Sequence, residues 1–592
     1  MLNTYTVNSL RELIYTAEGR RKASLVITNT KLVNVLTHEI EEGVDIAVQG
    51  DRIVSVGKAD KLVGKETITI DGSGLYTGPG LIDPHMHIES SLLTPDNFAK
   101  LALPAGTTAI FADPHEIENA CGLDGLNYFV NTAKVLPLKI FITEASCVPP
   151  MPGFETGGAA LTAEDVDSTI DLPEIIGLGE VMNYQDVLNG DRRLLGEIVQ
   201  TLKRGKAVEG HAPTLRNDDL NAYLDAGITS DHQCTTMGEA LEKLRRGMMV
   251  YARESSISQN VKEVIKAVTQ TGIDSRNMSL CTDDITASDM YNVGHMNHVL
   301  ARAIEEGVDP ITAFQMATVN TALHYKMADT LGSIAPFKMA DMILLNDITV
   351  PKPRYVIANG KVVAKDGILM VKLPSTKVPH KLLNSIKLKG VSKDAFSLPA
   401  GDGKSERGAR VIAIKESTSH TKLLERKVNI VNGQVELDGE LAKVAVFERY
   451  GRSGDVALGL VSGFNITKRG AAASSFSHDT HNIIVVGSSD DDMALAVNRI
   501  IEIQGGMVVV RDGRVVAQLE LPIGGVLSAE EASKVIGKEE GMADAWKSLG
   551  CDLKSPGNHL SSLTLTAIPE IRITNRGLID TVNFKPVQLF TS

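Results

Sequence analysis

The stretch PGLIDPHMHIESS, residues 79–91, decides how the rest of this chain is interpreted. His85 and His87 stand two apart at the end of an apolar, strand-like segment. Side chains at positions i and i+2 share one face of a strand, so both imidazoles can reach a single metal ion. A pair of core or surface histidines explains an isolated His-x-His equally well, so the remaining sequence has to decide.

Four further metal-capable residues each follow an apolar run. They are Glu180 in IIGLGEVMN, His211 in AVEGHAP, His232 in ITSDHQ and Asp283 in MSLCTDD. An apolar run, a polar side chain and a turn, repeated with helical segments between, is how a (β/α)8 barrel presents residues at the carboxyl ends of its strands. The sequence therefore predicts an α/β fold with a metal-dependent (β/α)8 barrel over about residues 76–330.

These motifs resemble the amidohydrolase superfamily and, within it, the bacterial adenine deaminases. The resemblance rests on residues 79–91 and on ADPHEIENACG (112–122), GLGEVMN (177–183), EGHAP (209–213) and CTDD (281–284). It continues in GLVSGFNITKRGAAASSFSHDTHNIIVVG, residues 459–487. It thus covers nearly the whole chain, whereas a generic amidohydrolase would match only the barrel.

The segments that flank the barrel predict further domains. Residues 1–75 combine a helical leader with alternating β-rich runs, and residues 331–371 are similar to the amidohydrolase segment that returns to complete a small β-sandwich with them. Residues 372–408 are rich in Pro, Lys and Gly, which is typical of a linker. Residues 409–592 alternate strand and helix patterns, which predicts a C-terminal α/β (α+β) domain of the adenine deaminase type.

Composition restricts the partners. With 60 Lys and Arg against 73 Asp and Glu, the net charge of −13 argues against nucleic acid or an anionic membrane as a partner. Five cysteines without CxxC spacing make disulfides and a structural zinc site unexpected. No apolar run approaches the ~20 residues of a membrane span, and no signal-peptide core is present. We expect a cytoplasmic homo-oligomer, a dimer.

Four histidines and two carboxylates without a thiolate suit Zn²⁺, Fe²⁺ or Mn²⁺, and ligand type does not choose among them. The resemblance implies Mn²⁺ or Fe²⁺, as a binuclear pair. Its ligands are then His85 and His87 for one ion, His211 and His232 for the other, Glu180 as the bridge and Asp283 to complete the first site. A glutamate bridge, unlike a carbamylated lysine, requires no bicarbonate.

The activity that the resemblance implies is hydrolytic deamination of adenine to hypoxanthine and ammonia by a metal-activated hydroxide, in purine salvage or catabolism. Asp283 is expected to carry a proton from the water to the departing amine. Negative charge develops on the ring nitrogens, so an acid must face N1. Glu89, or the pair His115 and Glu116, are the candidates. The alternatives are that Glu89 orients a ligating histidine and that His115 and Glu116 cap a helix.

Other residues are candidates for contacts with the base. Asp284 is expected at the purine N7 edge, by similarity to purine deaminases with a TDD sequence. Glu254 and Ser255 resemble a family segment near strand 7. His478 and His481, in SFSHDTHNIIVVG, belong to a domain that can close over the barrel mouth, unless this is only a polar loop bonded to itself.

Alternative functions remain at this stage. A cyclic-amide hydrolase of the dihydroorotase or hydantoinase type uses the same hydroxide on a carbonyl, but the glutamate at 180 and the long C-terminal region count against it. The chain has no P-C-x-x-C motif of the other deaminase class and no phosphate-binding loop. A barrel kept only for binding would have lost ligands, and none of the six expected ligands is missing.

Overall fold

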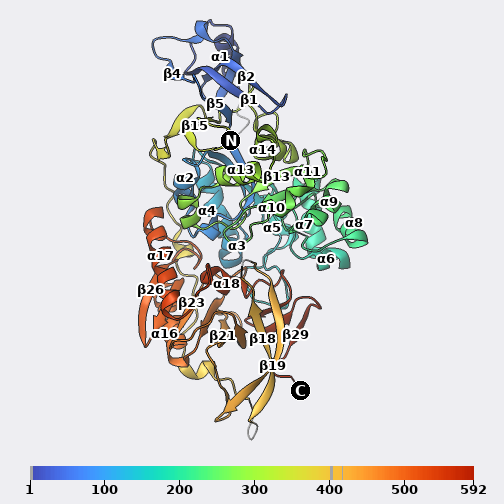
Figure 1. Cartoon of the computed structure of the whole chain (residues 1–592), viewed down its shortest axis with the longest axis vertical. Coiled ribbons are helices and arrows are strands. Elements are labelled where there is room, and N and C mark those ends of the chain that lie inside the picture. The colour runs from blue at the N-terminus through green and yellow to red at the C-terminus, as the bar shows by residue number, and fades with distance from the viewer. Residues whose placement is uncertain (1–4, 401–404, 417, 592) are drawn as a thin grey trace.

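The computed structural model describes residues 5–400, 405–416 and 418–591. The molecule is elongated: the sheet formed by the N-terminal strands lies at one end, helices surround parallel strands in the middle, and the C-terminal strands form the other end (Figure 1). Within the described ranges, no helix has the length and apolar character required to cross a bilayer.

The middle of the molecule holds eight parallel strands in two sheets, with the orders β10-β9-β8-β7-β6 and β11-β12-β13. Their bounds are β6 (Leu81–Met86), β7 (Thr107–Ala112), β8 (Lys139–Glu144), β9 (Ile175–Leu178), β10 (Ala207–Val208), β11 (Ser230–Asp231), β12 (Met249–Arg253) and β13 (Met278–Cys281). A parallel bridge between Met86 and Asp283 joins the two sheets on one side. On the other side the Thr229 N–H donates to the Val208 carbonyl at 2.9 Å.

These strands are almost wholly buried because helices cover them, as the near-continuous apolar runs predict. The covering helices include α2 (Pro95–Ala102), α4 (Leu123–Ala133), α7 (Arg192–Lys203), α8 (Asn217–Asp225), α9 (Met237–Arg245) and α13 (Met296–Glu305). Local sequence fixes their ends: Thr236 and Glu239 form a reciprocal capping box at the start of α9. The residues after Asn260 form two short helices, α10 (Val261–Val264) and α11 (Lys266–Thr269).

The strands before and after this middle part share one sheet, of order β17-β16-β15-β14-β5-β1-β2-β3 with β4 on β1. The bounds are β1 (Leu25–Asn34), β2 (Glu39–Gln49), β3 (Arg52–Gly57), β4 (Ile68–Asp71), β5 (Tyr76–Pro79), β14 (Met342–Leu345), β15 (Pro353–Ala358), β16 (Lys361–Lys365) and β17 (Ile368–Leu369), preceded by helix α1 (Val7–Ala17). Met342 lies opposite Pro79, so the chain returns to its own starting point before it continues.

The C-terminal part contains a sheet of order β20-β19-β18-β22-β21-β24-β23-β25-β26 and a smaller sheet β27-β28-β29. The strand bounds are β18 (Glu406–Ile414), β19 (Thr421–Val431), β20 (Gln434–Val435), β21 (Leu441–Phe447), β22 (Val456–Ser462), β23 (Gly470–Ser474), β24 (Ile483–Gly487), β25 (Gly506–Arg511), β26 (Arg514–Glu520), β27 (Ile571–Thr574), β28 (Gly577–Asp580) and β29 (Lys585–Val587). The helices of this part are α16 (Asp490–Ile503), α17 (Ala532–Ser548) and α18 (Pro556–Ser562). Helix α17 contacts α2 and α12 (Ala287–Asn292) of the middle part. The two parts therefore pack directly against each other.

The segment for which the sequence predicts a linker has regular structure of its own. It contains the 3-10 helices His380–Leu383 and Lys393–Phe396, and the ring of Phe396 is fully buried. The Gly524 N–H donates to the Leu382 carbonyl at 2.7 Å. Residues 372–400 thus lie along the C-terminal part.

Candidate active site

The six residues expected to bind metal converge at the carboxyl ends of the parallel strands. His85 and His87 come from the end of β6, Glu180 follows β9, His211 follows β10, His232 follows β11 and Asp283 follows β13. Each of the six side chains is buried, with at most 3% of its residue exposed. They come together because the strands are parallel, so every strand ends at the same face.

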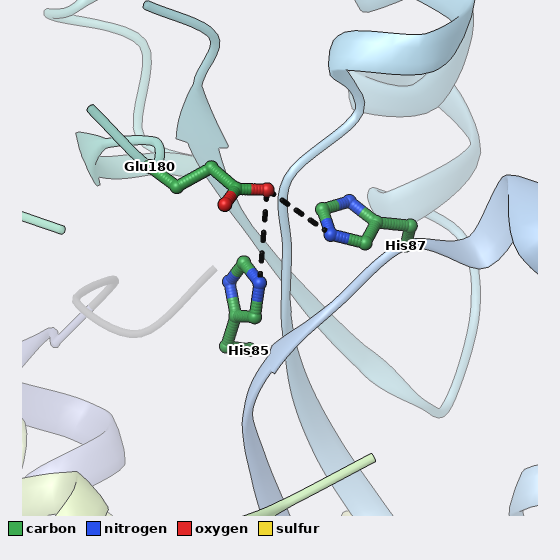
Figure 2. Close-up of side chains that lie close together, drawn as sticks. All are labelled: His85, His87 and Glu180. Atoms are coloured by element: carbon green, nitrogen blue, oxygen red, sulfur yellow. Dashed lines mark ion pairs between the residues drawn. The ribbon is translucent and has the colours of Figure 1, made fainter. Parts of the chain in front are cut away.

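The Glu180 carboxylate lies between the two histidine pairs. Its Oε1 is 3.3 Å from His87 Nε2 and 3.9 Å from His85 Nε2, and Figure 2 shows both rings turned toward it. Its Oε2 is 2.5 Å from His211 Nδ1 and 3.3 Å from His232 Nε2. One oxygen for each pair is the arrangement of a bridging ligand.

Asp283 completes the cluster next to β6. Its Oδ1 lies 3.2 Å from His87 Nε2 and 3.8 Å from His85 Nε2. Its Oδ2 accepts a hydrogen bond from Arg253 Nη1 at 2.5 Å. The guanidinium therefore fixes the orientation of a carboxylate that has one oxygen free for an ion.

The donor atoms fit a metal centre. Among the described residues, the buried atoms His85 Nε2 and His211 Nε2 have no hydrogen-bond partner. Burial and the neighbouring His232 hold the pKa of His85 well below its usual value, so the ring is neutral, the form that coordinates metal. Two groups of three ligand atoms, His85 with His87 and Glu180, and Glu180 with His211 and His232, each lie within 4.8 Å of one another.

Side chains behind the ligands hold them in place. Asp113 accepts from the backbone N–H of Glu180 at 2.8 Å, and its own carbonyl accepts from His87 Nδ1 at 2.9 Å, which leaves Nε2 of that ring for a metal. Asp231 pairs with Lys243 at 2.9 Å, and its other oxygen accepts from the Ala212 N–H at 2.7 Å. These contacts fix the loops that carry three of the ligands.

A cavity of about 60 Å³ opens beside the cluster and has walls from two parts of the chain. The middle part contributes several of the ligands together with His115, Glu116, Arg253, Ser255 and Asp284. The C-terminal part contributes His478, Asp479, Asn558 and Ser562, among others. Polar groups of both parts therefore line one cavity next to the candidate metal ligands.

Comparison with known proteins accounts for both parts. The Amidohydrolase family model matches residues 77–363, and the Adenine deaminase C-terminal domain model matches residues 418–585. A relative from Moorella thermoacetica named adenine deaminase is 45% identical over 98% of both chains. The chain belongs to the adenine deaminase family. Family members from Clostridium botulinum strain Langeland, 40% identical over 100% of both chains, and from Ruegeria sp., 41% identical over 97% of this chain and 96% of the relative, are similar in the same way.

The two family matches divide the cavity between them. All six strand-end residues lie in the amidohydrolase match, and His478 and Asn558 lie in the adenine deaminase C-terminal match. The family resemblance predicted from the sequence is thus confirmed, together with its extension beyond the amidohydrolase part.

The other candidate residues fall into two groups. Asp284 lines the cavity and accepts a hydrogen bond from the Ser90 hydroxyl. His115 lines it as well, with its ring 4.5 Å from that of His87. Ser255 also lines the cavity, whereas its neighbour Glu254 points away and lies 3.5 Å from Arg302 Nε, because successive extended residues face opposite sides.

Glu89 and His481 lie behind the cavity wall. Glu89 accepts from the Ile117 N–H at 3.2 Å, and burial raises the pKa of its carboxyl to about 7. His481 is fully buried and meets Glu116 instead of the cavity. Both residues therefore touch the lining of the cavity through a neighbour and not the cavity itself.

Sequence reasoning missed several groups of the site. Arg253 ends β12 and holds Asp283, and Asp113 supports two ligands from the motif ADPHEIEN. Both residues show the same sequence pattern as the expected metal ligands, a polar residue at the end of an apolar run. Asn558 has no such signal, because helix α18 brings it to the cavity from the C-terminal part.

Proposed function

We propose that this protein catalyses the hydrolytic deamination of adenine to hypoxanthine and ammonia. The observation that carries the proposal is similarity to adenine deaminases along the whole chain, at 45% identity over 98% of both chains for the Moorella thermoacetica relative. The converging ligands and the cavity beside them support it independently. A cyclic-amide hydrolase is not favoured, since the C-terminal match is specific to adenine deaminases.

The proposed metal centre is a Mn²⁺ pair, or Fe²⁺, held by the six strand-end side chains. The bridging position of Glu180 between two histidine pairs supports two ions. When bound, the ions supply hydroxide as a nucleophile near neutral pH. A glutamate needs no carbamylation, so activity is expected to be independent of bicarbonate.

Proton transfers are assigned to groups of this chain. Asp283 is proposed to take the proton of the attacking oxygen and to deliver it to the departing amine, while Arg253 holds its second oxygen. The proposed site for the N7 edge of the base is Asp284, which Ser90 orients. Ser255 and His115 are proposed to position the ring from the remaining walls.

The remaining candidates receive supporting roles. We assign Glu89 to positioning the start of α3 (His115–Cys121), through the Ile117 N–H. The ion pair of Glu254 with Arg302 is proposed to hold the segment after β12. His478 and His481 are proposed to close the cavity from the C-terminal side and to shield the reaction from water.

Architecture and setting are proposed as well. We infer that the eight parallel strands form a closed (β/α)8 barrel over residues 76–330, with a β-sandwich from residues 1–75 and 331–371. The proposed C-terminal domain covers residues 409–592, after a connecting segment over 372–408. A cytoplasmic dimer that takes part in purine salvage remains our prediction.

The test is ammonia release from the purified protein loaded with Mn²⁺ or Fe²⁺, with adenine, adenosine and dihydroorotate in parallel. Release from adenine alone, with an equal amount of hypoxanthine, is the expected result. Ring opening of dihydroorotate without ammonia from adenine would contradict the proposal. Addition of bicarbonate serves as the control, since it should leave the rate unchanged.

A further inference from the structure

Glu116 joins the two walls of the cavity. Its side chain is fully buried at the start of α3 (His115–Cys121), and each of its oxygens meets one imidazole from the C-terminal part. Oε1 pairs with Nδ1 of His478, and Oε2 lies 2.5 Å from Nε2 of His481. We call residues 477–482, which carry both rings, the clamp loop.

The tautomer of His481 follows from its other contact. The Ser477 N–H donates to His481 Nδ1 at 3.1 Å, so that nitrogen is an acceptor. Nε2 then carries the proton and donates it to Glu116. Burial lowers the pKa of His481, in agreement with a neutral ring. His481 therefore satisfies one oxygen of Glu116 without neutralising its charge.

His478 faces that remaining charge. Glu116 approaches it from α3, Asp284 from the segment after β13, and Asp479 and His481 from its own loop. His115 lies next to Asp479, with its Nε2 3.7 Å from Asp479 Oδ1. Burial lowers the pKa of His478, but Glu116, with Asp284 and Asp479, outweighs burial and raises it to about 9. The ring is thus an imidazolium at neutral pH, with Nδ1–H committed to Glu116.

The second ring nitrogen of His478, Nε2, is not taken by Glu116. Among the described residues, Nε2 makes no hydrogen bond. It is also absent from the buried atoms that lack a partner, so Nε2 is accessible. Of its side chain 14% is exposed, whereas Glu116 and His481 are wholly covered. His478 lines the catalytic cavity. An N–H donor with a positive charge is therefore presented to whatever occupies that space.

From this geometry we propose that His478, held as an imidazolium by Glu116, is the acid that protonates N1 of the purine. The proposal rests on the proposed function. As hydroxide adds to C6, the C6–N1 π electrons form the new N1–H bond, and the Nε2–H bond electrons stay on His478 as a lone pair. Asp283 carries the hydroxide proton to the amine, which leaves as ammonia. The next water returns a proton to His478 when it forms hydroxide.

Hydrogen bonds to the backbone of the clamp loop fix the position of His478. The backbone N–H of His478 donates to the Ser561 carbonyl at 3.2 Å, and the Thr564 hydroxyl donates to the His478 carbonyl at 2.6 Å. The fully buried Arg449 donates to the carbonyl of His481. A positioned general acid contributes about 10²–10⁴-fold to the rate.

The first test compares wild type with His478→Gln, which keeps a hydrogen-bond donor but cannot release a proton. We expect kcat with adenine to fall by about 10²–10⁴-fold. Metal content should stay the same, and the inhibition constant of hypoxanthine should change by less than about tenfold. His380→Gln, at an exposed histidine of the connecting segment, is the matched control. A kcat within about tenfold of wild type would overturn the proposal.

The pH profile separates proton donation from a structural role. The protonated form is active, so the wild-type rate should fall as the pH rises through about 9. Glu116→Gln removes the facing charge and should move this fall down by about 1–3 pH units. An unmoved fall in that variant would overturn the proposal even if His478→Gln does not fold. Wild-type protein that releases no ammonia from adenine at any pH would instead refute the proposed function.

Discussion

The two walls of the catalytic cavity are built in different ways. In the middle part, each expected metal ligand stands at the carboxyl end of a parallel strand, two of them on β6, and the sheet fixes their positions. On the C-terminal side, one loop is fixed by side chains that bond its backbone, Arg449 above all. Strand-end positions follow from local sequence. The clamp loop instead depends on a contact between His478 and Glu116, which lie 362 positions apart in the chain.

The largest effect is expected at the strand-end wall. Glu180→Gln removes the charge that both histidine pairs face, so the ions should be lost and kcat should fall on the order of a thousandfold or more. Metal analysis and ammonia release on the same sample measure this. Glu66→Gln, at an exposed glutamate of the N-terminal region, is the control. A fully loaded variant at the wild-type rate would remove Glu180 from the site.

A buried ion pair behind the same wall gives the next effect. Asp231 and Lys243 are at most 1% exposed, and Lys243 also donates to the Ala212 carbonyl at 2.7 Å. Lys243→Met leaves a buried carboxylate without its cation and should cost about 3–5 kcal/mol of unfolding free energy. Urea denaturation measures it, with the exposed Lys262→Met as the control. A loss below about 1 kcal/mol would show that the pair is not needed to hold these loops.

Removal of the C-terminal support should have a smaller effect. Arg449 donates to three acceptors, namely the carbonyls of His481 and Gly524 and the hydroxyl of Ser385. Arg449→Met leaves them unpaired but also removes the cost of a buried charge, so we expect a loss of about 2–3 kcal/mol, with metal content unchanged. Arg514→Met, at an exposed arginine of β26, is the matched control. Loss of metal along with stability would show that the two walls are not independent.

The smallest effect belongs to an exposed contact between the connecting segment and the middle part. Lys381 pairs with Asp124, and their side chains are 65% and 40% exposed. Solvent screens such a pair, so Lys381→Ala should change the unfolding free energy by less than about 0.5 kcal/mol. Denaturation in low and high salt checks this. A cost as large as that of Arg449→Met would mean that the two parts are joined by exposed charge instead of buried hydrogen bonds.

The difference between the walls also explains what sequence reasoning could reach. Apolar runs with a polar residue at the end pointed to the six side chains that converge as candidate metal ligands, because parallel strands bring such residues to one face. The same pattern stood at Arg253 and Asp113, and both were overlooked. For Glu116 the sequence did not decide between two roles, an acid facing N1 and a helix cap, because its partners His478 and His481 lie in a distant segment.

Side-chain direction was the second limit. Glu254 and Ser255 were grouped together, yet only Ser255 lines the cavity, because adjacent extended residues face opposite sides. The segment over 372–400 has the composition of a linker but packs along the C-terminal part through buried side chains such as Phe396. Composition describes the average character of a segment and not the surface that it meets.

The central claim is that the clamp loop and the strand ends form one active site. A double-mutant cycle on kcat with Glu116→Gln, His478→Gln and the double variant, at pH 8 with full metal loading, tests it most directly. If Glu116 acts by keeping His478 protonated, the double variant should match His478→Gln within about threefold. Two losses that multiply would show that the residues act separately, and would contradict the account.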